Sequence, residues 1–415
     1  MPSTLILKIT KKYYLGLKNK IFISILCTFC TFISYAQMPY TNWCGALQLN
    51  DTIELPVYFY INAKNILIQN GDEKIYIDEV IHKEDSIFFR MPVFDSEFRC
   101  KITGDKMNVY FYNYARKNKN IIPFHAERCV SISSPPISNK PSLNISGRYH
   151  VVFNDESVDS KDAVGIFTQN GINLTGTFLT TTGDYRYLSG KVDNGRIWLS
   201  TFDGSHLFVF TALIKNDSLV NGEFFSGQHW HGTWKGRKNE YAKLLSADSL
   251  TFLKTGYEKI DFIFPDENGR NVSLTDSKFK NKAVIIQLMG TWCPNCMDET
   301  KFLSEWYNKN RKKNIEIIAL DYERFLDTTT VNKNIRRLKK RFDVNYPILF
   351  AGSSDKKEAS LTLPMLNRVF AFPTTIYLNK EKKVIKIHTG FSGPATGVEH
   401  EKFIEWFENL TDQIK

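Results

Sequence analysis

Two cysteines separated by a Pro-Asn dipeptide, Cys293 and Cys296, are the residues of this sequence whose types and spacing most clearly suit chemistry. They follow the apolar run AVIIQLM (283–289) and precede residues with helical periodicity, so the pair should lie where a strand gives way to a helix. Cys293 then becomes the N-cap, and Pro294 takes the first helical position, which tolerates a missing N–H. The free N–H groups and the positive end of the helix dipole favour a thiolate. We therefore expect Cys293 to be a nucleophile.

The second cysteine lies one helical turn further along the chain. Cys296 is close enough to Cys293 to form a small disulfide ring, and it is too shielded by the helix to attack a large substrate itself. We expect it to resolve the mixed disulfide that Cys293 forms with a substrate.

A carboxyl group follows at the position that completes the same helix face. Leu303, Trp306 and Tyr307 form an apolar stripe, and Glu299 and Cys296 continue this stripe toward the N-terminus at helical spacing. We expect Glu299 to be partly buried beside Cys296, with a raised pKa that allows proton exchange near neutral pH. A solvent-facing glutamate that stabilises the first turn is the structural alternative.

The elements around this site alternate between strands and helices after about residue 258. Such alternation predicts a mixed sheet covered by helices, an α/β domain over residues 258–415. The predicted strands are 283–289, 315–321, the segment YPILFAG, 373–379 and 382–390; the predicted helices begin at Pro294 and span 328–342, a stretch near 357–367, and 397–410.

The preceding 200 residues consist of short, alternating or aromatic-rich runs broken by Gly, Asn and Asp, as in antiparallel sandwiches or barrels. Three turn sequences recur in order: Gln69–Gly71 and Gln169–Gly171, Phe94–Ser96 and Phe202–Gly204, and Ile102–Asp105 and Ile214–Asp217. We predict two related β-rich modules, residues 37–135 and 141–240, separated by the Ser/Pro-rich segment 131–141 and followed by a linker at 241–257.

The first 36 residues have the pattern of a secretory signal. Five lysines and no acidic residue precede or flank an apolar stretch that ends in Ser34-Tyr35-Ala36. The stretch is shorter than the roughly 20 residues that span a bilayer, so we expect cleavage after Ala36, with an uncleaved membrane anchor as the alternative. Export places the chain in the periplasm or cell envelope.

Charge suggests no nucleic-acid partner. The net charge of +10 falls to +5 without the five leader lysines, and the remaining charges lie in mixed-sign segments that suit solvated faces. Cys44, Cys100 and Cys129 also remain, and their wide spacing favours a structural bridge or buried thiols over a second redox pair, although the sequence leaves their pairing open.

Residues 258–415 resemble the thioredoxin-like domain of the TlpA/ResA-type thiol-disulfide oxidoreductases of the redoxin superfamily. The resemblance rests on the Trp292-Cys293-Pro294-Asn295-Cys296 motif after a strand, on Glu299 in the helix, and on Phe372-Pro373 before the strand 373–379. It implies a nucleophilic Cys293, a resolving Cys296, a proton-transferring Glu299, and a cis-proline loop at Phe372 and Pro373 that, with Trp292, contacts the substrate. Gln287 occupies the position of the buried aspartate of thioredoxin, so proton transfer must use Glu299 or water.

The resemblance also implies a function. We expect a protein-disulfide reductase of the cell envelope that needs no cofactor or metal, acts on disulfide-bearing envelope proteins, and is reduced again by an upstream membrane thiol reductant. Cytochrome c maturation is one role of the family. The Pro-Asn dipeptide lacks the histidine of strongly oxidising pairs, which favours reduction.

Three alternatives use the same residues differently. A thioredoxin-fold peroxidase shares the domain but typically places a threonine three residues before the cysteine, whereas Thr291 lies two before Cys293. A binding module could carry the Cys-Pro-Asn-Cys motif as a structural disulfide. A zinc site would need four ligands, and His388 and His400 are not paired at ligand spacing.

Overall fold

The computed structural model of the 415-residue chain describes residues 40–130, 143–154 and 162–414. The predicted signal sequence (1–36) and the Ser/Pro-rich segment (131–141) therefore lie outside the described residues. The described residues from Thr41 onward belong to one compact unit. Within the described ranges, no helix combines the length and apolar character that crossing a bilayer requires.

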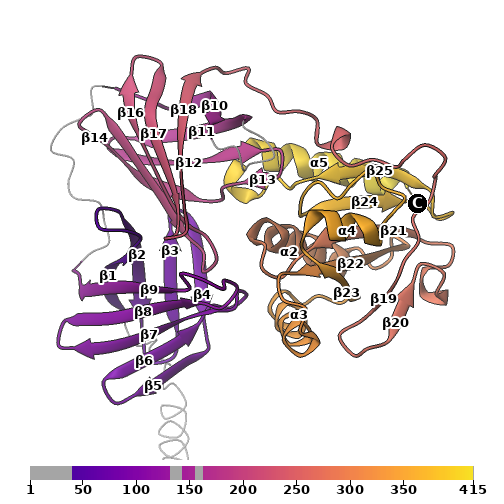
Figure 1. Cartoon of the computed structure of the whole chain (residues 1–415), viewed down its shortest axis with the longest axis horizontal. Coiled ribbons are helices and arrows are strands. Elements are labelled where there is room, and N and C mark those ends of the chain that lie inside the picture. The colour runs from indigo at the N-terminus through magenta and orange to yellow at the C-terminus, as the bar shows by residue number, and fades with distance from the viewer. Residues whose placement is uncertain (1–39, 131–142, 155–161, 415) are drawn as a thin grey trace, which may run out of the picture. The chain divides into compact units, whose positions relative to one another are not determined.

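The first β-rich region is one antiparallel sheet of nine strands (Figure 1). Its order is β4-β3-β2-β1-β9-β8-β7-β6-β5, so the first strand lies between the second and the last. The strands are β1 (Thr41–Gln48), β2 (Glu54–Ile61), β3 (Ile66–Asn70), β4 (Glu73–Ile77), β5 (Val80–Lys83), β6 (Ser86–Arg90), β7 (Ser96–Thr103), β8 (Lys106–Asn113) and β9 (Ile121–Arg128).

Alternating burial explains why these runs form a curved sheet with one apolar face. In β2, every second residue from Leu55 to Ile61 is buried, because successive side chains of a strand point to opposite faces. Phe59 contacts Phe98 and Phe124 edge-on at ring-centroid distances of 5.3 and 5.2 Å. A disulfide joins Cys44 in β1 to Cys129, the residue that follows β9.

The second β-rich region is a closed barrel. Its order is β11-β10-β18-β17-β16-β15-β14-β12-β13, and β11 also pairs with β12, which closes the sheet. The strands are β10 (Gly147–Phe153), β11 (Asp162–Asn170), β12 (Asn173–Thr180), β13 (Gly183–Asp184), β14 (Leu188–Asp193), β15 (Arg196–Phe202), β16 (Leu207–Lys215), β17 (Ser218–Ser226) and β18 (Trp230–Lys238). The aromatic residues that were prominent in the sequence fill its interior, among them Phe178, Phe210 and Trp234.

Two of the three recurring turns occupy equivalent places in the two sheets. The Phe-Asp pair precedes the seventh strand of each region, β7 and β16, and the Ile102–Asp105 and Ile214–Asp217 turns follow those strands. The Gln-Asn-Gly turns do not correspond, because one joins the third and fourth strands and the other the second and third. The shared pairing of first and last strands is consistent with two related modules.

The C-terminal region has a five-stranded mixed sheet in the order β23-β22-β21-β24-β25. The three strands β21 (Ala283–Met289), β22 (Ile315–Glu323) and β23 (Ile348–Ser353) are parallel, whereas β24 (Thr374–Leu378) and β25 (Val384–Thr389) are antiparallel additions. The helices are α2 (Pro294–Lys309), α3 (Thr328–Phe342), α4 (Lys356–Thr362) and α5 (Val398–Gln413); a hairpin of β19 (Ile263–Pro265) and β20 (Asn271–Ser273) precedes the sheet. Short 3₁₀ turns lie at η1 (Ala247–Ser249), η2 (Ser277–Phe279) and η3 (Pro394–Thr396).

The strand and helix predictions for this region are confirmed, with one difference. Every residue of β21 and β22 is buried, as expected for strands covered on both faces. The helix expected near 357–367 ends earlier, at Thr362. Pro364 disfavours helical backbone angles at Leu363, which adopts φ −129° and ψ 66°.

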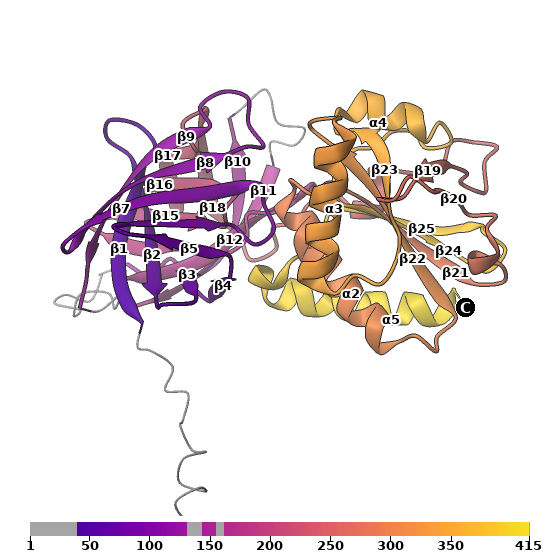
Figure 2. The ribbon, with the colours of Figure 1, turned by 90° about the horizontal axis from the view of Figure 1, so that it is seen from below.

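Helix α2 lies next to both α3 and α5 (Figure 2). Its buried face contacts α5 through Trp306 and Phe407, whose rings lie 5.1 Å apart edge-on. At its other side, Ser304 donates a hydrogen bond to the carbonyl of Asp343, at the end of α3. This packing holds the start of α2, and therefore Cys293, at the carboxyl end of the central strand β21.

Candidate active site

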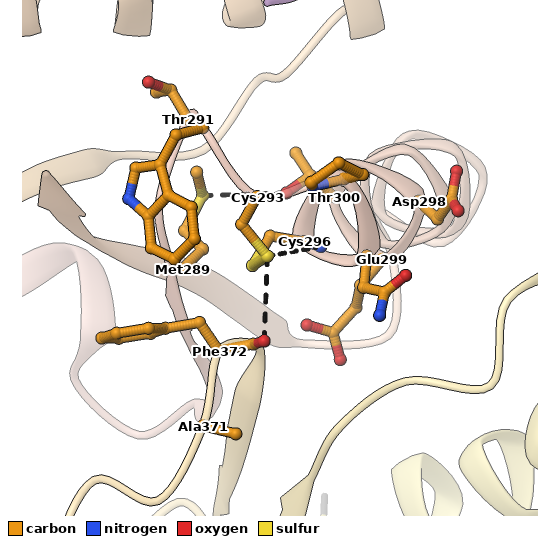
Figure 3. Close-up of a disulfide and its surroundings, with 12 residues drawn as sticks. Met289, Thr291, Cys293, Cys296, Asp298, Glu299, Thr300, Ala371 and Phe372 are labelled. Atoms are coloured by element: carbon orange, nitrogen blue, oxygen red, sulfur yellow. Dashed lines mark hydrogen bonds between the residues drawn. A yellow bond between two sulfur atoms is a disulfide. The ribbon is translucent and has the colours of Figure 1, made fainter. Parts of the chain in front are cut away.

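Cys293 and Cys296 form a disulfide at the first turn of α2 (Figure 3). Cys293 is the N-cap, its sulfur lies 3.2 Å from the backbone nitrogen of Cys296, and Pro294 occupies the first helical turn. The predicted placement of both residues is confirmed. Cys293 is 6% exposed and Cys296 is fully buried, so only Cys293 offers its sulfur to another molecule.

The proline loop faces the same sulfur. The peptide bond between Phe372 and Pro373 is cis, as the resemblance implied. The Cys293 sulfur lies 3.7 Å from the carbonyl oxygen of Phe372 (Figure 3). Trp292 contacts Phe372 edge-on, with ring centroids 6.1 Å apart. Trp292, Phe372 and Pro373 thus border the reactive sulfur, where an extended substrate backbone could pair with the loop.

Glu299 is more deeply buried than its sequence pattern predicted, with an exposed fraction of 1%. Its side chain leaves α2 on the same side as the disulfide, whereas that of Asp298 extends away from it (Figure 3). Burial raises the pKa of Glu299 to about 7, against hydrogen bonds that lower it. These come from the hydroxyl of Thr375, at 2.7 Å, and the amide nitrogen of Gln287, at 2.8 Å. The carboxyl group can therefore exchange a proton near neutral pH.

Gln287 connects this carboxyl group to the helix. Its amide nitrogen also lies 3.4 Å from the carbonyl oxygen of Cys296, and its amide oxygen accepts a hydrogen bond from Thr300 at 3.0 Å. A glutamine at this position cannot carry a proton as the aspartate of thioredoxin does. It orients Glu299 instead.

The loop before the cysteines is held by a second carboxyl group. Glu323, at the end of β22, accepts a hydrogen bond from the backbone N–H of Thr291 at 2.9 Å and another from the Thr291 hydroxyl. Burial raises the pKa of Glu323, against hydrogen bonds from Thr291 and Asp321 that lower it. The guanidinium of Arg324 lies over the Trp292 ring, 4.1 Å from its centroid. Both contacts fix the backbone that leads into Cys293.

The barrel also contributes to the site. Arg186, between β13 and β14, donates a hydrogen bond to the carbonyl of Pro294 at 3.2 Å and forms an ion pair with Asp298. Asn295 donates a hydrogen bond to the carbonyl of Asp184 at 3.1 Å. The first turn of α2 is therefore bound by residues more than 100 positions earlier in the chain.

The structure brings together all six residues that the sequence singled out: Trp292, Cys293, Cys296, Glu299, Phe372 and Pro373. The sequence analysis missed Thr375, Glu323 and Arg186. Thr375 could have been found, because it follows Pro373 by two positions on a strand and shares its face. Nothing in the local pattern around Arg186 indicates its role.

The other cysteines of the described residues lie away from this site. Cys44 and Cys129 are paired with each other, and Cys100 is a buried thiol in β7. In the part of the chain that the structure describes, no group of three His, Cys, Asp or Glu side chains is arranged to hold a metal ion.

Sequence comparisons agree with this geometry. The family model described as Redoxin matches residues 254–401. Thiol-disulfide oxidoreductase ResA of Geobacillus thermodenitrificans (strain NG80-2) is 30% identical over 140 residues, which cover 34% of this chain and 72% of the relative. ResA of Bacillus subtilis (strain 168) is 26% identical over 138 residues, 33% of this chain and 69% of the relative.

Among solved structures, the chain matches the thioredoxin domain of a thiol-disulfide oxidoreductase from Bacteroides vulgatus. It is 22% identical, covers 37% of this chain and 99% of that domain, and has a TM-score of 0.28. A thiol-disulfide oxidoreductase from Bacteroides fragilis is 19% identical over 35% of this chain and 99% of its own, with a TM-score of 0.26. On the evidence of the sequence relatives and the Cys293–Cys296 disulfide at the start of α2, the chain belongs, through its C-terminal domain, to the TlpA/ResA-type thiol-disulfide oxidoreductases of the redoxin superfamily.

Proposed function

We propose that this protein reduces protein disulfides in the cell envelope through the dithiol of Cys293 and Cys296. One observation carries the proposal: the Cys293 sulfur caps a helix N-terminus 3.7 Å from the Phe372 carbonyl, while Cys296 is fully buried behind it. This arrangement presents one nucleophile beside the carbonyl of the proline loop and keeps its partner for the second step.

The reaction proceeds by two thiol-disulfide exchanges. The Cys293 thiolate attacks one sulfur of the substrate disulfide, which forms a mixed disulfide and releases the other substrate sulfur as a thiolate. The Cys296 thiolate then attacks the Cys293 sulfur, which closes the Cys293–Cys296 disulfide and releases the second substrate thiolate. Two electrons pass from the dithiol to the substrate, and two protons reach its thiols.

Glu299 supplies the base for the second exchange. Cys296 must lose its proton before it attacks, and a buried carboxyl group with a pKa of about 7 can accept that proton when it is ionised. The reverse transfer protonates Cys296 when a donor dithiol reduces the pair again. Thr375 and Gln287 hold the carboxyl group in place for both transfers.

Two features support a location outside the cytoplasm. The first 36 residues have the composition of a secretory signal, and the Cys44–Cys129 disulfide suits an oxidising compartment. An enzyme that reduces disulfides there needs electrons from the inside, so we propose a membrane thiol reductant as the donor. The proposed substrates are disulfide-bearing envelope proteins, among them proteins that take part in cytochrome c maturation.

Parallel assays on the wild type and the Cys293→Ser variant test this function. We expect the wild type to reduce insulin disulfides, the variant to be inactive, and neither to consume peroxide at a comparable rate. Peroxide consumption that depends on Cys293 would support the peroxidase alternative, and two inactive proteins would favour a binding module.

The redox potential of the Cys293–Cys296 pair tests the direction of the reaction. A value near thioredoxin's, about −270 mV, supports a reductase. A value near about −120 mV would make the protein an oxidase instead.

A further inference from the structure

The barrel contacts the residues that flank the reactive cysteines, and not merely the outside of the C-terminal domain. We define the clasp as Asp184, Arg186 and Ser205 of the barrel. Arg186 binds the Pro294 carbonyl, Asp184 accepts a hydrogen bond from Asn295, and Ser205 donates one to the Trp292 carbonyl at 3.3 Å. The contacted residues are the one before Cys293 and the two between the cysteines.

Buried ion pairs hold Arg186 of the clasp in its position. Arg186 is buried, and a buried charge is tolerated only where opposite charges and hydrogen bonds compensate for lost water. Its guanidinium forms ion pairs with Asp298 on α2, with Glu73 on β4, and with Asp203 at 3.2 Å. One arginine therefore joins the active-site helix to both β-rich regions.

The loop of residues 183–186, which carries Asp184 and Arg186 of the clasp, packs closely against the active site. Gly183 has a φ of 136°, which favours glycine, and a Cβ atom there would collide with the Asn295 side chain. On the other side of the loop, Asp184 accepts a hydrogen bond from the backbone N–H of Gly393 at 2.7 Å. The loop therefore fits between Asn295 and the segment that follows β25.

Hydrogen bonds from the first sheet hold the barrel segment that carries Ser205 of the clasp. Asn70 of the first sheet accepts a hydrogen bond from the backbone N–H of Phe202 at 3.3 Å, and Ser96 donates one to the carbonyl of Gly204 at 2.6 Å. These contacts hold the segment that carries Asp203 and Ser205. The barrel segment beside the cysteines is thus part of a packed structure and not a free loop.

We propose that the barrel is one wall of the substrate site and that its clasp selects substrates by shape. The clasp covers the surface around Trp292, Pro294 and Asn295. A substrate with a broad protein face would have to contact that surface to reach Cys293, whose exposed fraction is only 6%. On the other side the Phe372–Pro373 loop faces the Cys293 sulfur, and both of its residues are buried, so the approach to this sulfur is narrow. The fitting substrate is a disulfide on a narrow, extended segment, such as an unfolded polypeptide. This specificity rests on the proposed function.

Size-dependent labelling of the reduced full-length protein tests the proposal without any activity assay. N-ethylmaleimide and a maleimide on a polyethylene glycol chain of about 5 kDa attack the same thiolate by the same chemistry. Their rate ratio at Cys293 therefore cancels changes in thiol reactivity and reports steric access. Peptide mass spectrometry assigns the label, and the buried Cys100 stays unlabelled as long as the protein is folded.

We expect the large reagent to react at least tenfold more slowly than the small one with the wild type, and this gap to shrink at least fivefold in Arg186→Gln. Asn295→Ala, which loses the hydrogen bond to Asp184 and the packing of the amide group against Gly183, provides a second variant without a buried charge and should shift the ratio in the same direction. Arg148→Gln is the matched control, since Arg148 pairs with Glu399 on α5 at 3.1 Å and so links the barrel to the same domain away from α2.

An equal change in Arg148→Gln would assign the effect to general loosening and overturn the role of the clasp. If the rate ratio of the two maleimides is unchanged in folded Arg186→Gln and folded Asn295→Ala, the proposal that the barrel borders the substrate site is wrong. Failure of the insulin assay together with a shifted ratio would leave the wall intact and refute only the reductase function.

Discussion

Gln287 donates a hydrogen bond to the carboxyl group of Glu299 over 2.8 Å, in the interior beside the Cys296 backbone. Where thioredoxin has a single buried aspartate, this chain has two residues: Gln287, whose amide group orients its neighbour, and Glu299, whose carboxyl group titrates. Because Glu299 is buried, its environment raises its pKa to about 7, in the range where the thiol of Cys296 needs a base. The proposed mechanism therefore makes its clearest predictions at this residue.

Replacing Glu299 by Gln keeps the shape and removes the titrating proton. We expect the resolving step to slow by on the order of 100-fold at pH 7, the low end for general acid–base catalysis. In the wild type this rate should rise as the pH passes about 7, when the carboxyl group becomes ionised. Single-turnover oxidation by a peptide disulfide between pH 5 and 9 measures both effects. A Glu299→Gln profile that matches the wild type would remove Glu299 from the mechanism.

The same substitution should change how stability depends on pH. The folded state holds the Glu299 proton up to pH 7, whereas the unfolded chain releases it near 4.5. The wild type therefore binds more protons when folded across that window, and its free energy of unfolding falls as the pH rises from about 4.5 to about 7. The loss should be about 3 kcal/mol at most.

Chemical denaturation at several pH values, compared with Glu299→Gln, isolates this contribution from the other buried carboxyl groups. The difference between the two proteins should change across the window and be constant above it. A constant difference from pH 4 to 8 would contradict the raised pKa.

Thr375→Val removes a hydroxyl that donates to Glu299 and changes the volume of the side chain little. Since that hydrogen bond stabilises the ionised carboxylate, we expect the pKa of Glu299, and with it the inflection of the rate profile, to move to higher pH. Thr374→Val is the matched control, because the Thr374 hydroxyl donates to the Ala371 carbonyl instead. A downward shift, or equal shifts in both variants, would refute the assignment.

The Cys44–Cys129 disulfide should stabilise the first sheet without taking part in catalysis. Its residues are 85 positions apart, and removing a bridge of this kind typically costs about 2–4 kcal/mol. We expect the double variant Cys44→Ala/Cys129→Ala to unfold at a lower denaturant concentration and to reduce insulin as fast as the wild type under native conditions. Loss of activity in a folded double variant would instead indicate electron transfer through this pair.

The sequence alone identified the chemistry and its local setting. Cys293, Pro294 and Glu299 are placed by rules that act within one strand, one helix cap and one apolar stripe, so their positions follow from residues a few places away. The same holds for α3, whose predicted bounds of 328–342 match the structure. The proline loop was found through the family resemblance, because Phe372 and Pro373 directly precede the strand predicted at 373–379.

Only the tertiary structure decided what surrounds that chemistry. Thr375 reaches Glu299 across 76 positions and Arg186 reaches Asp298 across 112. Strand alternation places Thr375 on the face that Pro373 shares, but it does not identify Glu299 as the partner, and nothing around Arg186 indicates Asp298. The pairing of Cys44 with Cys129 likewise follows from β1 lying beside β9. Such contacts depend on how separate sheets pack against one another, and this packing is determined by shape and buried charge across the whole fold. Local periodicity in the sequence indicates only which face of each element is buried.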